Sequence, residues 1–272
     1  MKRNLSTILL VLVFFIGLSL LLYPSVSDYW NSFHQSRAIA TYAETVATID
    51  KDAYNAYWED AHAFNRNIQA RPNIFTLSEE EERAYYQALN VSDNGIMGYI
   101  EIPSIKCSLP IYHGVDEAIL QIAVGHIEWT SLPVGGGSTH SVLSGHRGLP
   151  SAKLFTDLDQ MTVGDIFMMR ILDETLTYQV DQILIVEPWN VDALHIVPGE
   201  DLCTLVTCTP YGINSHRLLV RGHRVENLEE ASAIYVTADA LQIEPVLVAP
   251  LVAAPMLLIL MLYILLRPRK RR

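Results

Sequence analysis

The stretch TLVTCTPYGINSHR, residues 204–217, reads as a β-strand, a polar turn and the start of a second strand. It places Cys208 at the end of the first strand and Arg217 at the start of the second. A short connection joins antiparallel neighbours, so these two residues are expected to lie close together. A thiol that faces a fixed cation is the start of a nucleophilic site, because the cation favours the thiolate or stabilises an oxyanion.

The chain around this stretch, from about residue 96 to residue 225, alternates short strand patterns with turns rich in Gly, Pro, Asn and Asp. Many short strands without regular helices between them predict one closed or nearly closed β-barrel, and about 130 residues suffice for such a core. The predicted strands are Gly98–Ile102, Lys106–Ile111, Ser141–Ser144, Ile166–Ile171, Leu176–Val186, Leu202–Thr207 and Arg217–Arg224. The expected fold class is therefore mainly β.

The region before the barrel, from about residue 28 to residue 89, is rich in Ala and helical in pattern. Apolar residues at spacings of three and four predict one long helix, which an aromatic-rich extension continues until Pro72 ends it. Its apolar stripe packs on the following domain, the more ordinary arrangement, or against a coiled-coil partner. Ser78 and Glu81 predict a capping box for a shorter helix through Leu89. The stripe comprises Ile39, Tyr42, Val46, Ile49 and Ala53, and the extension adds Tyr54, Tyr57, Trp58 and Phe64.

Two uncharged apolar runs lie outside these regions, at residues 5–23 and 246–266. Each is long enough to cross ~30 Å of hydrocarbon as a helix. The first is also compatible with a cleaved signal peptide, but no clear cleavage site follows it, so an uncleaved anchor is favoured. Lys2 and Arg3 precede the first run, and the basic tail RPRKRR at 267–272 follows the second. This arrangement predicts a two-pass protein of the cell membrane with cytoplasmic termini and an extracellular region from about residue 25 to 243.

The charge of the chain is unevenly distributed. The whole chain has 19 basic and 30 acidic residues and a net charge of −11. Seven of the basic residues lie in residues 1–3 and 267–272, which leaves 12 basic against 30 acidic residues elsewhere, a formal charge of −18. A surface that acidic argues against nucleic-acid binding.

The three cysteines, Cys107, Cys203 and Cys208, leave at least one thiol unpaired even where disulfides form. Cys203 and Cys208 lie at an odd separation in one extended run, so their side chains point to opposite faces of the sheet. They are not expected to bridge each other or to share a metal. Cys107 is most simply a small core residue. Residue types alone leave two interpretations of Cys208 open, a nucleophile and a buried inert thiol.

A thiol nucleophile also needs a group that protonates the departing amine, and histidine is the usual one. His140 and His146 lie at the two ends of THSVLSGHR (139–147), where a strand ends in a glycine-flanked turn that can present a side chain at a barrel rim. His146 is the candidate partner of Cys208, and chemistry alone gives it even odds. His216 adjoins Arg217, so on a strand the two face opposite ways. No local context singles out His34, His62, His113, His126, His195 or His223.

The run TLVTC at 204–208, with Arg217 nine residues after Cys208, resembles the active-site signature of sortases. The wider match resembles class C, the pilus-assembling sortases. A carboxy-terminal membrane helix also fits class C, whereas class A sortases typically have only the amino-terminal anchor. The matching segments cover residues 96–225 almost without a gap: MGYIEIP at 97–103, LPIYHG at 109–114, GH at 125–126, TSLPVGG at 130–136, SGHRG at 144–148 and LLVRG at 218–222.

The resemblance implies an eight-stranded sortase barrel that follows a helical and lid region and is flanked by two transmembrane helices. It implies that Cys208 is the nucleophile, His146 the general acid, and Arg217 the residue that positions substrate and stabilises the oxyanion. The implied activity is that of a thiol transpeptidase without a metal or cofactor. It would cleave an LPxTG-type sorting signal between Thr and Gly and pass the thioacyl group to a pilin lysine.

The partners implied by the resemblance are pilin or surface-protein precursors that carry such signals, and the lipid bilayer. Two alternatives stay open. One is a sortase that attaches surface proteins to the cell-wall peptide. The other, less favoured, is a sortase-like binding protein without turnover.

Class C sortases commonly carry a lid with an Asp-Pro-aromatic motif, in which the Asp pairs with the catalytic arginine and the aromatic residue covers the cysteine. In this chain Pro72 is the only proline between residues 28 and 94, and Arg71 precedes it. An arginine would repel Arg217. We therefore expect a lid segment around residues 69–78 that lacks the ionic latch, in which Phe75 can still cover Cys208. The thiol should then react readily without substrate.

The expected organisation has six segments. They are a cytoplasmic tip and transmembrane helix at 1–24, an extracellular helical region at 25–95, the barrel at 96–228, a linker at 229–245, a second transmembrane helix at 246–266 and a basic cytoplasmic tail at 267–272.

Overall fold

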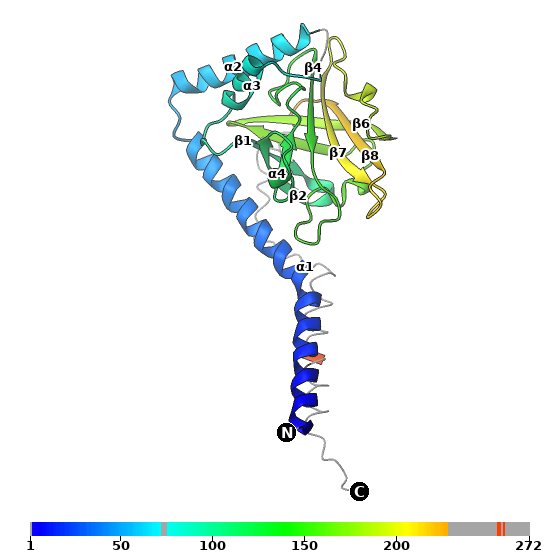
Figure 1. Ribbon diagram of the computed structural model, residues 1–272. Helices are drawn as coiled ribbons and strands as arrows, with labels where there is room; N and C mark the ends of the chain where they lie inside the picture. The colour runs from blue at the N-terminus through cyan, green and yellow to red at the C-terminus, as the bar shows by residue number, and fades with distance from the viewer. Residues whose placement is uncertain (1, 72–74, 228–254, 257, 259–272) are drawn as a thin grey trace.

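A computed structural model describes residues 2–71, 75–227, 255, 256 and 258 of the chain. Its central feature is a closed eight-stranded barrel with the strand order β1-β2-β3-β4-β7-β8-β6-β5 (Figure 1). The predicted barrel is therefore confirmed. The strands are β1 Ile96–Ile102, β2 Cys107–His113, β3 Val124–His126, β4 Thr139–Ser144, β5 Ile166–Ile171, β6 Glu174–Val186, β7 Asp201–Thr209 and β8 His216–Arg224.

All seven strands predicted from the sequence are present, with ends that differ by a few residues. The eighth strand, β3, was not predicted, because three residues are too few to show an alternating pattern. It closes the barrel by pairing parallel with β2 and antiparallel with β4. The other parallel pair is β4 with β7, which brings the ends of these two strands to the same rim.

Within residues 2–71 and 75–227, four α-helices accompany the barrel: α1 Lys2–Val46, α2 Lys51–Gln69, α3 Glu79–Gln87 and α4 Glu117–Leu120. The capping box predicted at Ser78 and Glu81 is present at the start of α3. The prediction of one helix through the stripe that ends at Ala53 is wrong, because α1 stops at Val46 and α2 starts at Lys51. Asp50 causes the new start: its Oδ1 accepts hydrogen bonds from the backbone N–H groups of Asp52 and Ala53.

The stripe packs on the barrel, as the favoured interpretation expected. Tyr42 of α1 is 1% exposed, and its hydroxyl donates to Met97 O at 3.0 Å and accepts from Leu172 N at 2.8 Å. α2 and α3 add Phe64, Ile68 and Tyr85 to the apolar cluster that fills the barrel. Burial of each such side chain stabilises the fold by roughly 1.5–3 kcal/mol.

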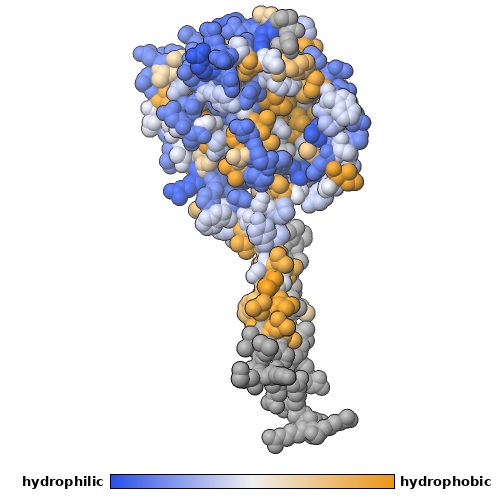
Figure 2. Space-filling view, viewed as in Figure 1, coloured by the Kyte–Doolittle hydropathy of each residue, from blue (hydrophilic) through white to orange (hydrophobic). Residues whose placement is uncertain are grey.

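The N-terminal half of α1 projects away from the barrel (Figure 1), and the helix continues unbroken across residue 24. Its surface below the barrel is apolar (Figure 2). Among the described residues it is the one helix long and apolar enough to cross a membrane, which suggests membrane anchoring. The second predicted span, 246–266, lies almost wholly outside the described residues, as do the linker and the basic tail.

Candidate active site

The predicted nucleophile and cation face each other at one rim of the barrel. In the β7–β8 register Cys208 pairs with Arg217, as the strand–turn–strand pattern predicted. Leu205 and Leu218 belong to the apolar cluster inside the barrel, whereas Val206 and Leu219 belong to a second, smaller cluster outside it. Because side chains alternate along a strand, Cys208 and Arg217 lie on the outer face with that second cluster.

β4 brings His146 to the same rim. Its parallel register with β7 pairs Ser144 with Val206. The pairing extends past the strand end, since Gly145 N donates to Val206 O at 3.0 Å and Thr207 Oγ1 donates to Gly145 O at 2.8 Å. The same register, carried two residues further, would bring residue 146 level with Cys208. The parallel pairing therefore unites two segments that are 62 positions apart in the sequence.

Glycines explain why the chain around His146 takes this path. A Cβ on Gly145 would lie 2.7 Å from the ring of Phe155, so the close approach of that buried ring requires glycine. Gly148 has φ +73°, and a Cβ there would lie 2.8 Å from the ring of Tyr211. The turn after His146 thus packs directly on the β7–β8 connection, which joins the two halves of the site.

The guanidinium of Arg217 is held by backbone oxygens. Its Nη1 donates to Asn214 O at 3.3 Å and to His216 O at 3.1 Å. No carboxylate within the described ranges forms an ion pair with it. Arg221, four positions along the same face, instead forms a two-pronged ion pair with Asp181. The turn therefore orients the Arg217 cation while leaving its charge available to an incoming anion.

Glu117 is a neighbour of His146 that the sequence did not reveal. Its Oε2 lies 3.6 Å from His146 Nε2, and the His146 side chain is 27% exposed. Hydrogen bonding from Gln121, together with the nearby imidazole, lowers the pKa of the Glu117 carboxyl. Glu117 begins α4, and no local sequence pattern connects that short helix with residue 146. Thr207 and Phe155, which hold the segment next to His146, were missed for the same reason.

The other thiols lie where their chemistry is suppressed. All three cysteines are free. Cys203 is fully buried, its Sγ lies 3.7 Å from Met169 Sδ, and burial raises its thiol pKa well above the usual value. Burial also raises the pKa of Cys107 to about 12. The predicted opposite orientation of Cys203 and Cys208 is thus observed, with Cys203 inward and Cys208 outward and half-buried.

The buried histidines are structural. Burial lowers the pKa of His140 to about 4, and its Nε2 lies 2.7 Å from Thr204 Oγ1. Burial likewise lowers the pKa of His126 to about 3, and its ring nitrogens contact Tyr85 and Ser131. Neither side chain lies at the rim that carries Cys208.

The described residues of the predicted lid segment contact α3 and the loops of the barrel. The Arg71 guanidinium pairs with Glu81 at 3.2 Å and also donates to Thr76 O, so Glu81 of α3 takes up its charge. Phe75 places its ring against Trp129 and His195, at centroid distances of 5.2 and 6.0 Å. Trp129 packs on the outer apolar cluster that neighbours the site. Pro72, the third residue named for the lid, lies outside the described residues.

The arrangement suits nucleophilic attack on a carbonyl. A thiol and a cation that can bind a developing oxyanion lie opposite each other on one face, and the segment with the His146 imidazole follows the neighbouring strand. Within residues 2–71 and 75–227, no group of three or more His, Cys, Asp or Glu side chains is arranged to hold a metal ion.

Comparisons with known proteins agree with this geometry. Residues 100–225 match the sortase domain family. Sortase C1 from Streptococcus agalactiae is 50% identical to this chain in sequence, and its crystal structure matches with a TM-score of 0.69. The match covers 71% of this chain and 100% of that one. Sortase C of Streptococcus pneumoniae is 45% identical in sequence, its structure matches with a TM-score of 0.62, and the match covers 70% of this chain and 97% of that one. Sortase A of Streptococcus agalactiae is 25% identical over 206 residues, 74% of this chain and 77% of that protein.

Proposed function

The chain belongs to the sortase family of cysteine transpeptidases, and from this premise we propose that it polymerises pilin subunits. In this proposal it cleaves an LPxTG-like sorting signal between Thr and Gly and transfers the thioacyl group to a pilin lysine. The observation that carries the proposal is the register that pairs Cys208 with Arg217, with the end of β4 alongside. Sortases C of Streptococcus agalactiae and Streptococcus pneumoniae resemble this chain, and the structure of the latter is described as giving insight into catalysis and pilin substrate specificity.

The first half-reaction forms the thioacyl enzyme. The thiolate of Cys208 attacks the carbonyl carbon of the signal threonine, and Arg217 donates hydrogen bonds to the resulting oxyanion. The carbon–nitrogen bond to glycine then breaks, and His146 gives its proton to the departing amine. The product is a thioester at Cys208, with the glycine-containing fragment released.

The second half-reaction releases the acyl group to an amine. A lysine Nζ of a pilin attacks the thioester carbon, His146 accepts the proton that the amine loses, and Cys208 leaves as the thiolate. The product is an isopeptide bond between subunits. The thioester conserves the energy of the broken peptide bond, so the exchange needs no nucleotide.

Membrane attachment supports this role through proximity. The apolar part of α1 holds the barrel at a bilayer, and signal-bearing substrates held in the same bilayer meet it at a raised effective concentration. We place the barrel on the extracellular side and a second span at 246–266, on the charge distribution of the sequence.

The decisive experiment is a trap of the thioacyl enzyme. The full chain in detergent micelles is incubated with a panel of sorting-motif peptides and examined by intact-mass spectrometry. We expect an adduct on Cys208 that is missing in the Cys208→Ala variant. If no peptide of the panel gives an adduct, the proposal fails.

The acceptor is tested separately with purified pilin and with a wall-peptide amine. Covalent ladders with pilin support polymerisation. Transfer to the wall peptide alone would establish the anchoring function instead. Unimpaired pilus assembly with Cys208→Ala would point to a binding protein without turnover.

A further inference from the structure

One face of α1 carries polar side chains that reach the barrel. Asp28, Asn31, Gln35 and Tyr42 follow one another at spacings of three, four and seven, so they lie on the same side of the helix. Each forms a hydrogen bond with a backbone group of the barrel or its loops. Two of the contacts reach the loop that follows His146. Helix α1, whose N-terminal part is apolar, is therefore hydrogen-bonded to the loop that follows His146.

The loop from His146 to Phe155 is closed on itself and tied to α1. Phe155 N donates to His146 O at 3.1 Å, which closes the loop at its base. Asp28 Oδ1 accepts from Lys153 N at 2.8 Å, and Asn31 Nδ2 donates to Ser151 O at 2.8 Å. The backbone of this loop is thus bonded to His146 at one end and to the helix in its middle.

Leu154 lies between these bonds in an unfavourable backbone conformation, and its side chain is buried in the apolar cluster. Its φ is +39°, a left-handed backbone that a branched apolar residue rarely adopts. The residue before it, Lys153, is bonded to Asp28, and the residue after it, Phe155, is bonded to His146. Loss of the Asp28 bond would free Leu154 to relax, and the relaxation would reach the backbone of His146.

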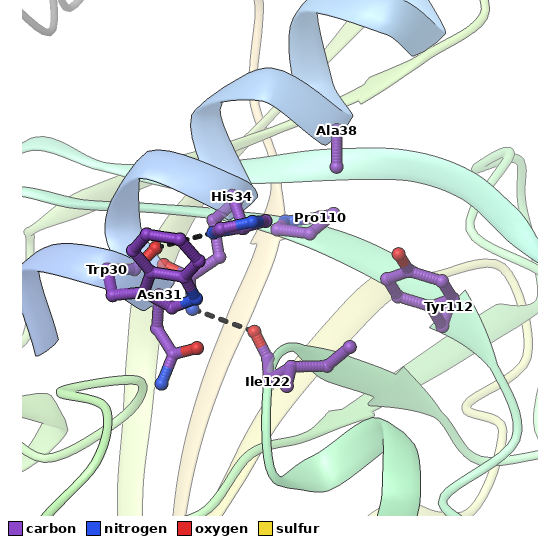
Figure 3. A pocket seen from close by; sticks show the side chains of 8 residues that line it. Trp30, Asn31, His34, Ala38, Pro110, Tyr112 and Ile122 are labelled. Atoms are coloured by element: carbon purple, nitrogen blue, oxygen red, sulfur yellow. Dashed lines mark hydrogen bonds between the residues drawn. The ribbon is translucent and has the colours of Figure 1, made fainter. Parts of the chain in front are cut away.

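The polar bonds matter because apolar packing under this part of α1 is incomplete. A pocket of about 370 Å³ separates the helix from β2 and the segment after α4. Figure 3 shows Trp30 and His34 of α1 on one side of it, with Pro110 and Tyr112 of β2 opposite. Gln35 Nε2 crosses to Ile122 O at 2.7 Å. Here hydrogen bonds, rather than interdigitated side chains, fix the helix to the barrel.

We propose that Asp28 and Asn31 are positioning residues for His146, and that α1 is in this way a structural part of the active site. They act through the backbone of residues 151–155 and touch no reacting atom. A small displacement of a proton donor lowers the rate of the chemical step more than it weakens substrate binding. The catalytic part of this inference rests on the proposed function.

The test uses the full chain in micelles with two readouts. Hydrogen exchange of residues 147–156 reports the loop directly, and kcat and KM for thioacyl formation with a sorting peptide report catalysis. For Asp28→Ala with Asn31→Ala we expect exchange about tenfold faster in this loop, kcat roughly tenfold lower and KM within about twofold of wild type. Asp28→Asn keeps an oxygen acceptor and should behave as wild type. Ser36→Ala, an exposed change on the same helix, is the matched control.

Wild-type exchange and wild-type kcat in the double variant would overturn the proposal. If the double variant fails to fold, the comparison of Asp28→Ala with Asp28→Asn decides in the same way. If the wild-type chain forms no thioacyl adduct, the proposed function fails, and the exchange measurement alone decides whether α1 holds the loop.

Discussion

The parallel strands β4 and β7 carry a histidine and a cysteine at each end, and the two ends differ completely in character. At the first end, His140 is 1% exposed and Cys203 is fully buried. At the other end, His146 and Cys208 are both partly exposed. The strands and the residue types are the same, but the register differs. His140 pairs with Leu202 and Cys203 pairs with Ser141, so the two side chains at the first end point to opposite faces of the sheet.

The two ends also differ in solvent exposure and in the charges nearby. Burial lowers the pKa of His140 to about 4 and raises that of Cys203, which keeps both groups neutral. At the other end, Arg217 lies opposite Cys208 on the outer face of the barrel, and Glu117 lies beside His146. The end of the strand gives access to solvent, β8 supplies the positive charge of Arg217 and α4 supplies the negative charge of Glu117.

Replacing the cysteine at each end should give the largest difference in activity between the two ends. Cys208→Ala should lower the rate of thioacyl formation by at least about 10³-fold, because it removes the nucleophile. Cys203→Ala should keep kcat and KM and lower the free energy of unfolding by about 1 kcal/mol. Peptide cleavage and urea unfolding of both variants check this. A Cys203→Ala enzyme as inactive as Cys208→Ala would show that the buried end takes part in catalysis.

Two of the three arginines of β8, Arg217 and Arg221, offer the next comparison. Arg217 has backbone partners only among the hydrogen bonds described, whereas Arg221 is paired with Asp181. Arg217→Ala should reduce kcat/KM by roughly 10²–10³-fold, the usual cost of a lost oxyanion donor. Arg217→Lys should recover little of it, since a lysine lacks the planar set of donors. Arg221→Lys is the matched control, and an equal loss in that variant would contradict a specific role for Arg217.

These contrasts also show what could be read from the sequence. The pairing of Cys208 with Arg217 was predictable, because a short turn joins antiparallel neighbours. The position of His146 beside them depends on the parallel β4–β7 pair, which no local pattern encodes, so the residue types left it at even odds. Only the resemblance to the sortases assigned His146 to the site. β3 was too short to be seen, and Asp50 divided a helix whose apolar stripe continues without interruption.

The buried histidines, His126 and His140 among them, should contribute to the acid sensitivity of the barrel, and the contribution of His140 can be separated. The folded-state pKa of His140, about 4, lies below its ordinary value of 6.5. Between these values the unfolded chain binds a proton that the folded chain does not. Stability is therefore lost as the pH falls from about 6.5 to about 4, by on the order of 3 kcal/mol at full effect.

Urea unfolding at several pH values between 7 and 4 tests this. His140→Gln should flatten the pH dependence in that window, whereas His62→Gln, an exposed change on α2, should leave it as in wild type. An unchanged slope in His140→Gln would mean that other groups account for the acid sensitivity.

The smallest effect is expected at the lid segment, where the reactivity of Cys208 is compared with and without the Phe75 ring. Arg71 stands where the lid motif of class C sortases has an acidic residue, and it pairs with Glu81. It therefore makes no bond that would fasten the lid segment to Arg217. Cys208 should then react with iodoacetamide readily without substrate, while Cys107 and Cys203 stay unmodified because burial raises their thiol pKa values.

Phe75→Ala removes the ring contacts with Trp129 and His195. It should accelerate the alkylation of Cys208 by no more than about twofold to threefold, because edge-to-face contacts of an exposed ring hold the lid segment by less than about 1 kcal/mol. Tyr54→Phe, a change on α2 that removes one hydrogen bond to Asp173, is the control. Alkylation rates of Cys208 by peptide mass mapping give the answer. Slow alkylation that speeds up only on deletion of residues 69–78 would mean that the segment is a closed latch despite its missing Asp-Pro pair.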